Sequence, residues 1–318
     1  MFTLAAGFVL FFYSERLFWT VMWPGTSVGE LAVTWLAYSA VAYLFLALES
    51  SLRASGVAAG MLAGAVYGWL IEGGIASTLY GTEPSAPWPW SISITGLSWH
   101  ALLSVMAGWR LTRWALAARS VWPLASVHAA VGCFWGVWAM FPRQESPQVA
   151  ATVGEFAVHA ATCALLLAVS WRVVGRAGAS GFKAGWLGLG VSSAVVGLFY
   201  AQHVMALGWR AAAMPALVGV AIGALAVGRG ERTAVKYRAT PLAAGTTPVT
   251  RGARRDWLGF AVLPVVATAV FAVGIELGWD RSPVAQVVFA IGGALGFVAF
   301  GAAVIGSVWR KPWNRVGG

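Results

Sequence analysis

The sequence predicts an all-α protein, a polytopic transmembrane helix bundle of about ten spans, and three observations lead to this fold class. Of the 318 residues, 59% are hydrophobic and only 10% are charged, whereas about a quarter of a typical soluble protein is charged. Apolar stretches of about 20 residues, enough to cross a bilayer as helices, alternate with short polar segments. Lysine and arginine concentrate in every second connection, which is the charge pattern of a polytopic membrane protein.

The first apolar window, residues 3–23, is expected to be a retained membrane span. It lacks the basic leader and the small-residue cleavage site of a signal peptide. It also carries Glu15 and Arg16 inside its apolar stretch, which a signal peptide would not. We therefore count this window as the first helix of the bundle.

Nine further windows follow, and turn-forming residues separate several of them. Pro24 and Gly25, the proline-rich stretch 84–89 and Pro142 all lie between windows, where helices are expected to end. The windows are 29–51, 56–80, 93–117, 120–141, 151–174, 184–206, 209–228, 257–279 and 284–308. The 39 glycines favour close helix–helix approach in lipid, because small residues let backbones pack.

The orientation follows from the positions of the 21 lysine and arginine residues. With a cytoplasmic N-terminus, 17 of them fall in cytoplasmic connections or the C-terminal tail. Only Arg143, Arg210 and Arg281 fall on the opposite side, and Arg16 lies within the first span. Both termini are therefore expected in the cytoplasm, because positive residues stay inside. The net charge of +10 reflects this topology, and we expect no nucleic-acid partner.

The longest connection suggests an eight-plus-two organisation. Residues 1–228 are expected to form an eight-helix transmembrane core, and 229–256 a basic cytoplasmic linker rich in proline, glycine and threonine. Residues 257–318 then form a terminal helix pair with a basic tail.

Several ionisable residues from different windows share one depth in the membrane. Glu15, Glu72, His100 and His159 lie about seven or eight residues from the outer ends of their windows, roughly 10–12 Å below the outer interface. Charged groups inside spans are costly and usually face the protein interior. We therefore expect an outward-facing pocket in the first six spans. A structural alternative is that Arg16 pairs with a carboxylate of another helix and that the histidines hydrogen-bond within the bundle.

The candidate site combines groups for proton transfer with groups for substrate binding. The acid–base or proton-relay candidates are Glu15, Arg16, Glu72, His100, Glu155 and His159. The substrate-binding candidates are Trp35, Trp99, Trp135 and Ser104, which would add an aromatic wall. Glu155 and His159 are four residues apart and so share one helix face.

Two cofactors are compatible with these residue types, although no motif selects either of them. Glu72, His100, Glu155 and His159 offer the oxygen and nitrogen ligands of a divalent metal. A haem held by His100, His159 or His203 is a less favoured alternative.

Three classes of function fit this pattern. The first is a transporter or permease in the cell membrane for a small or lipid-like substrate, with proton coupling through histidine and glutamate. The second is an intramembrane enzyme that acts on a lipid or isoprenoid through a carboxylate–histidine site, with or without a metal. The third is a non-catalytic subunit of a membrane complex. Besides the bilayer, the expected partners are the substrate and, for the third class, other subunits.

Overall fold

The computed structural model of the chain is all-α throughout the residues it describes, which are 1–21, 26–118, 120–144, 149–177, 182–232 and 254–309. These residues contain no strand. The principal helices are α1 (Phe2–Ser14), α2 (Val28–Ser51), α3 (Gly56–Trp69), α4 (Thr112–Ala117), α5 (Trp122–Trp138), α6 (Val153–Ala177), α7 (Trp186–Leu207), α8 (Ala213–Arg232), α9 (Arg254–Glu276) and α10 (Val284–Val308). Two segments are π-helical. Segment η2 (Leu70–Ile75) directly follows α3, and segment η4 (Ile92–Leu111) directly precedes α4. Every predicted window therefore corresponds to a helical segment.

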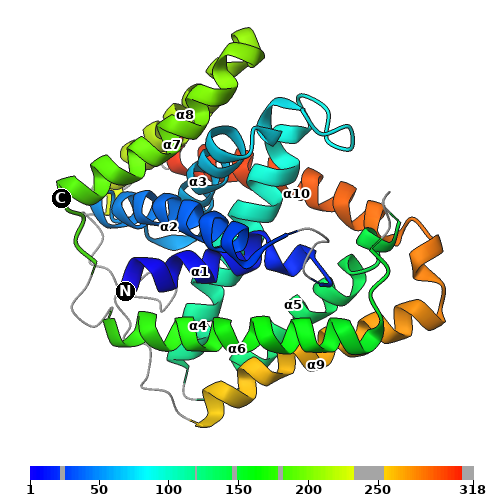
Figure 1. The fold of residues 1–318 in the computed structure, drawn as a ribbon. Coiled ribbons are helices and arrows are strands. Elements are labelled where there is room, and N and C mark those ends of the chain that lie inside the picture. The colour runs from blue at the N-terminus through cyan, green and yellow to red at the C-terminus, as the bar shows by residue number, and fades with distance from the viewer. Residues whose placement is uncertain (22–25, 119, 145–148, 178–181, 233–253, 310–318) are drawn as a thin grey trace. The chain divides into compact units, whose positions relative to one another are not determined.

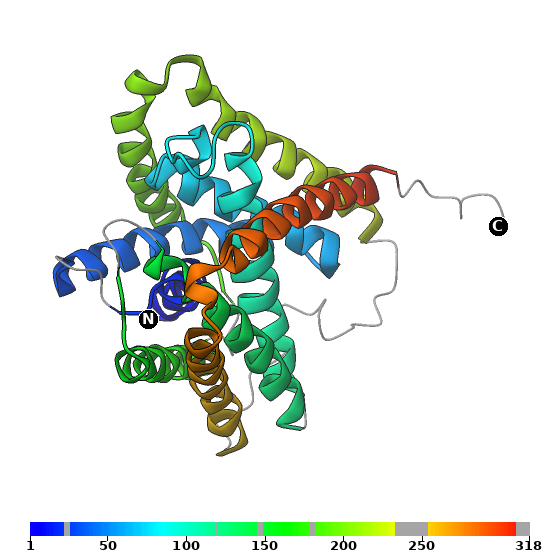
Figure 2. The ribbon, with the colours of Figure 1, turned by 90° about the vertical axis from the view of Figure 1, so that its right-hand side faces the viewer.

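Seven stretches of the described residues are long and apolar enough to cross a membrane, so the protein is an integral membrane protein. They are Val28–Ser51, Gly56–Ile75, Trp122–Arg143, Val153–Ala177, Trp186–Gly228, Arg254–Glu276 and Val284–Val308. The stretch of 43 residues holds both α7 and α8, and Figure 2 shows the chain reversing direction between these two helices. Eight of the ten predicted windows therefore overlap with these stretches over most of their length.

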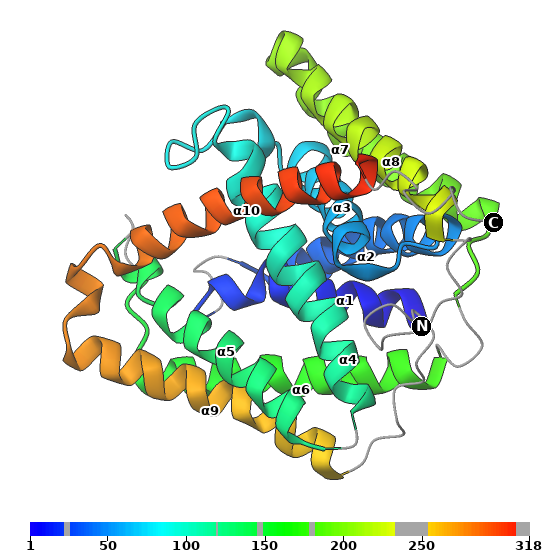
Figure 3. The same ribbon diagram turned by 180° about the vertical axis from the view of Figure 1, so that it is seen from behind.

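The other two windows form helices that do not meet these criteria. Helix α1 has 13 residues and is about 20 Å long, shorter than the roughly 30 Å of bilayer hydrocarbon. It ends at Ser14, and a short 3-10 turn, η1 (Arg16–Phe18), follows. The window 93–117 is occupied by η4, which runs into α4, as Figure 3 shows.

The chain divides into two compact units, each assembled from three separate parts of the sequence. Unit 1 comprises Met1–Ser39, Ala107–Gly181 and Thr246–Ile291, and unit 2 comprises Ala40–Met106, Phe182–Gly245 and Gly292–Gly318. Helices α2 and α10 and segment η4 contribute residues to both units. The predicted linker 229–256 lies mostly outside the described residues, and the eight-plus-two organisation stays a prediction.

Unit 1 is built around α9, which packs against both α5 and α6, with α1 packing on α6 (Figure 1). Aromatic rings connect these four helices. The ring of Trp135 on α5 contacts Phe12 of α1 and Phe156 of α6, both at a centroid distance of 5.5 Å. Phe156 in turn lies 4.6 Å from Phe271 of α9. Trp135 therefore lies at the centre of the unit, and it is fully buried.

Helices α5 and α9 approach closely through two glycines spaced four residues apart. A Cβ atom on Gly132 would lie 2.8 Å from the carbonyl oxygen of Leu263. A Cβ atom on Gly136 would lie 2.6 Å from the carbonyl oxygen of Ala267. This is the spacing with which small residues bring membrane helices into backbone contact.

Unit 2 contains α3, η2, α7 and α8, together with parts of η4 and α10. Helix α8 packs on α3, and both α7 and α8 pack on η2. Gly64 and Gly68 of α3 face η4, since a Cβ atom on Gly64 would lie 2.9 Å from Cα of Ala101. On the part of α10 in this unit, a Cβ atom on Gly292 would lie 2.7 Å from Oγ of Ser98. Segment η4 is therefore held between two glycine-lined helices.

Candidate functional site

Glu72 lies in a distorted part of its helix. Segment η2 continues α3, but its hydrogen bonds have the wider π-helical spacing, as in the bond from Ala76 N to Ile71 O at 2.9 Å. Such distortions in membrane helices are common at functional sites. Gly73 and Gly74 follow Glu72, and a Cβ atom on Gly74 would lie 2.7 Å from Cγ1 of Val196. The missing side chains let α7 and α8 pack closely here, and Glu72 is 7% exposed.

His100 lies in η4, the second π-helical segment, and is 1% exposed. The ring of Tyr67 on α3 contacts the imidazole edge-on, with 5.7 Å between ring centroids. Both residues belong to unit 2, as does Glu72. The imidazole is therefore buried, with the aromatic ring of Tyr67 against it.

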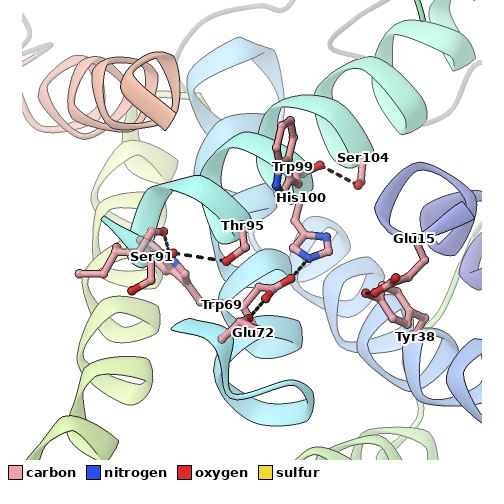
Figure 4. Close-up of polar contacts among 11 residues, drawn as sticks. Glu15, Tyr38, Trp69, Glu72, Ser91, Thr95, Trp99, His100 and Ser104 are labelled. Carbon is pink, nitrogen blue, oxygen red and sulfur yellow. Dashed lines mark hydrogen bonds and ion pairs between the residues drawn. The ribbon is translucent and has the colours of Figure 1, made fainter. Parts of the chain in front are cut away.

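Glu72 and His100 form a buried carboxylate–imidazole pair, shown in Figure 4. Nε2 of His100 is hydrogen-bonded to Oε1 of Glu72, and Oγ1 of Thr78 donates to the other carboxylate oxygen, Oε2. The glutamate therefore has a partner on each oxygen. A buried acid that is hydrogen-bonded in this way avoids the cost of an isolated charge in a low dielectric.

Hydrogen bonds hold the segment that follows Glu72 in place. The Trp69 indole donates to the carbonyl oxygen of Ile92 at 3.0 Å, and the Ser91 hydroxyl donates to that of Leu79 at 2.7 Å. Burial raises the pKa of Tyr80, so its phenol stays protonated and donates to the carbonyl oxygen of Gly73 at 2.9 Å. These bonds fix Thr78 near Glu72.

Unit 1 contains a second cluster of predicted site residues, centred on Arg16. Arg16 is 9% exposed and hydrogen-bonds through its side chain to the thiol of Cys163. The imidazole of His159 hydrogen-bonds to the backbone of Arg16 and of Trp19, and its Nε2 lies 3.8 Å from Sγ of Cys163. The Trp135 indole also donates to the Trp19 carbonyl oxygen, at 3.2 Å. Side chains from α5 and α6 therefore fix the turn that carries Arg16.

Glu15 and Trp35 make specific contacts elsewhere in unit 1. The phenol of Tyr38, on α2, donates to Oε1 of Glu15 at 2.6 Å, as Figure 4 also shows. The indole of Trp35 donates to the carbonyl oxygen of Leu4 at 3.0 Å. Trp35 thus helps to join α2 to α1.

Glu155 is exposed and caps its own helix. Its Oε2 accepts hydrogen bonds from the backbone N–H and the hydroxyl of Thr152, both at 2.8 Å, while Thr152 Oγ1 accepts from the Glu155 N–H at 3.2 Å. This reciprocal arrangement is a capping box. The carboxylate is therefore engaged at the helix N-terminus, although Glu155 and His159 lie one turn apart.

The remaining candidates, Trp99 and Ser104, lie in unit 2 on η4. Both are buried, and the Ser104 hydroxyl donates to the Trp99 carbonyl oxygen at 2.9 Å. The single pocket predicted from the shared depth would draw residues from both units, and it stays a prediction.

The four residues named as metal ligands do not assemble into a metal-binding group. In the described part of the chain, no three histidine, cysteine, aspartate or glutamate side chains gather so that they could hold a metal ion. Glu72 and His100 form a pair without a third ligand, and Glu155 is used as a cap. Of the three histidines considered as haem ligands, His203 has its Nε2 atom 3.3 Å from the carbonyl oxygen of Ile75.

Three contacts of the site were not anticipated from the sequence. Thr78 lies in a short connection, Cys163 reads as a small apolar residue, and Tyr38 lies on a different helix from Glu15. Only Cys163 carries a sequence signal, because it follows His159 by four residues and so shares its helix face.

Comparisons with known proteins add no assignment: no family model matches the chain, and neither the curated proteins nor the solved structures contain a match.

Proposed function

We propose that this integral membrane protein is a proton-coupled transporter or permease of the cell membrane for a small or lipid-like substrate. The observation that carries the proposal is the buried Glu72–His100 pair in unit 2. Ionisable residues inside membrane helices are costly and commonly form proton relays in transporters. Histidine is also the side chain whose charge changes nearest to neutral pH.

The pair can hold one proton between two groups. With one proton present, the pair is either an imidazolium with a carboxylate or a neutral imidazole with a carboxylic acid, and both forms are neutral overall. Gain or loss of a proton leaves a net charge in a buried place, which is unfavourable. A change in protonation can therefore drive a change in the packing around the pair, and this is the step that coupling requires.

Groups from several elements of unit 2 lie around the pair. Tyr67 and Thr78 contact it from α3 and from the connection after η2. On the helices that pack against η2, the imidazole of His203 lies near the carbonyl oxygen of Ile75. Arg210 donates to the carbonyl oxygen of Tyr80 at 3.5 Å. We assign the proton-carrying role to Glu72 and His100 because these two side chains contact each other.

The experiment is uptake into proteoliposomes followed by mass spectrometry. The probes are a polar small-molecule extract and a total lipid extract of the host cells, each offered with and without an acid-outside pH gradient. The wild-type chain is compared with Glu72→Gln and with Glu83→Gln, a control at an exposed position of the same unit. We expect one solute class to enrich, the gradient to increase the enrichment, and Glu72→Gln to abolish that increase.

Two results would contradict the proposal. If no probe enriches in any arm, the chain is not a transporter of these solutes. If Glu72→Gln keeps the full gradient dependence, the pair does not couple transport to protons. Appearance of a new lipid product in the vesicles would instead support an intramembrane enzyme that uses the same pair for acid–base chemistry.

A further inference from the structure

Arg16 is a buried cation in unit 1 whose contacts with the described residues do not include a carboxylate. The ion pairs among the described residues include those of His100 with Glu72, Arg143 with Asp280 and Arg255 with Asp256. Arg16 takes part in none of them, and its side chain hydrogen-bonds to the Cys163 thiol. The structure of the described residues therefore gives no support to the part of the structural alternative in which Arg16 pairs with an acid of another helix.

The groups around Arg16 cannot balance its charge. A guanidinium stays protonated in proteins and has five N–H donors. A thiol is a weak hydrogen-bond partner, and an imidazole carries either no charge or a positive one. His159 hydrogen-bonds to the backbone of Arg16 and Trp19, so it supports the turn and supplies no negative charge.

Thr20 provides a second, independent sign of a missing partner in this turn. It is 1% exposed, and its Oγ1 has no hydrogen-bond partner among the described residues. Buried hydroxyl groups are normally hydrogen-bonded, and each exception calls for an explanation. A bound group with acceptor oxygens would satisfy both Thr20 and Arg16.

We infer that Arg16, together with Thr20, forms a binding site for an oxyanion, that is, a carboxylate or phosphate group. The planar guanidinium matches both groups, because two parallel N–H bonds can reach two oxygens. Anionic ligands also offset the cost of a cation within a membrane protein. The aromatic surroundings, with Trp135 against His159 at 6.0 Å between ring centroids, suit a ligand that has an apolar body. The site goes beyond the proposed function, because binding does not require transport.

Thermal unfolding of the full-length chain in an uncharged detergent tests this inference. The free-anion arms contain inorganic phosphate or acetate at constant ionic strength, balanced with chloride. The lipid arm compares micelles containing phosphatidylglycerol with micelles containing phosphatidylcholine. A ligand that binds only the folded state raises the melting temperature, and the rise grows with the logarithm of the ligand concentration once this exceeds Kd. A rise with phosphate or acetate identifies a free anion, and a rise only with phosphatidylglycerol identifies a lipid headgroup.

Two variants decide whether Arg16 is responsible. Arg16→Gln is expected to melt at or above the wild-type temperature without anion, because it removes a buried charge that lacks an internal partner. It should lose the anion-dependent rise. The control is Arg143→Gln in the same unit, which breaks the ion pair with Asp280 at 3.5 Å. That variant should melt earlier but keep the full anion-dependent rise.

Three outcomes would overturn the inference. In the first, no anion raises the melting temperature of the wild-type chain. In the second, Arg16→Gln shows the same anion-dependent rise as the wild type. In the third, Arg16→Gln fails to fold in the absence of anion, which means that the cation has an essential partner inside the protein. Glu145 lies outside the described residues, and a double-mutant cycle of it with Arg16 would identify such a partner.

Discussion

Gly68 lies directly against the backbone carbonyl of Gly96, and each glycine precedes one member of the Glu72–His100 pair by four residues. A Cβ atom on Gly68 would also lie 2.8 Å from Cβ of His100. We therefore predict that Gly68→Ala forces α3 and η4 apart. Because both neighbouring atoms belong to well-packed segments, the free energy of unfolding should fall by about 1–3 kcal/mol. Chemical denaturation in detergent measures this change, and proton-dependent uptake should fall with it.

The control for this substitution is Gly197→Ala on α7 of the same unit. No atom outside its own helix lies within 4 Å of a Cβ atom on Gly197, so the new methyl group has room. Alanine in the middle of a helix is more favourable than glycine by about 0.5–1 kcal/mol. We expect this variant to be more stable than the wild type. A loss of stability equal to that of Gly68→Ala would show that the effect does not depend on the glycine contact.

Glu155 is predicted to matter for helix stability and not for proton transfer. Glu155→Ala removes half of the capping box with Thr152, which should lower the free energy of unfolding by about 1 kcal/mol. Glu155→Gln should have little effect, because glutamine serves equally well at this position of the box. Uptake assays on both variants check this assignment. Loss of gradient-dependent uptake in Glu155→Gln would instead restore Glu155 as a proton-relay residue.

Gln144 is predicted to hold the turn between α9 and α10. Its side-chain amide donates to the carbonyl oxygens of Trp279 at 3.3 Å and Ser282 at 2.8 Å, and Gln286 donates to its oxygen at 2.6 Å. Gln144→Ala removes these three hydrogen bonds, which should cost about 1–3 kcal/mol.

Hydrogen–deuterium exchange measures the effect as faster exchange in residues 278–283. The matched control is Gln202→Ala, because Gln202 is exposed and forms no side-chain hydrogen bond within the part of the chain that the structure describes. Unchanged exchange in Gln144→Ala would mean that the turn is held by other contacts.

The helices of this protein could be predicted from composition, but the partners within the site could not. An apolar window such as 284–308 is identified by length and hydropathy alone, and α10 occupies the same residues. Glu72 and His100 could be placed at a similar depth, yet their contact depends on how α3 and η4 pack at Gly68 and Gly96. That packing is a tertiary property without a local signal.

Glu155 shows the opposite case, in which a local signal exists and predicts a role other than the expected one. Threonine followed three residues later by glutamate is a capping-box pattern, and it precedes an apolar run in α6. The helical spacing of Glu155 and His159 suggests a shared site, but the Glu155 carboxylate is hydrogen-bonded to Thr152 in the cap. The partners of the Arg16 side chain could not be predicted from the sequence, because only three-dimensional contacts reveal whether an acid lies beside it.

Besides α1, the number of membrane crossings depends on the segment 92–117, which is helical but is not among the seven stretches that meet the length and hydropathy criteria. If it crosses the membrane, Glu83 and Ser120 lie on opposite sides. Single cysteines at these positions, in a chain with Cys133→Ala and Cys163→Ala, test this with a membrane-impermeant maleimide. Both positions are exposed and lie outside the candidate spans. The excess of positive charge in cytoplasmic connections predicts that intact cells label Glu83→Cys only, and that Ser120→Cys requires permeabilised cells. Labelling of both positions from the same side would mean that this segment does not cross, and the ten-span topology would then be wrong.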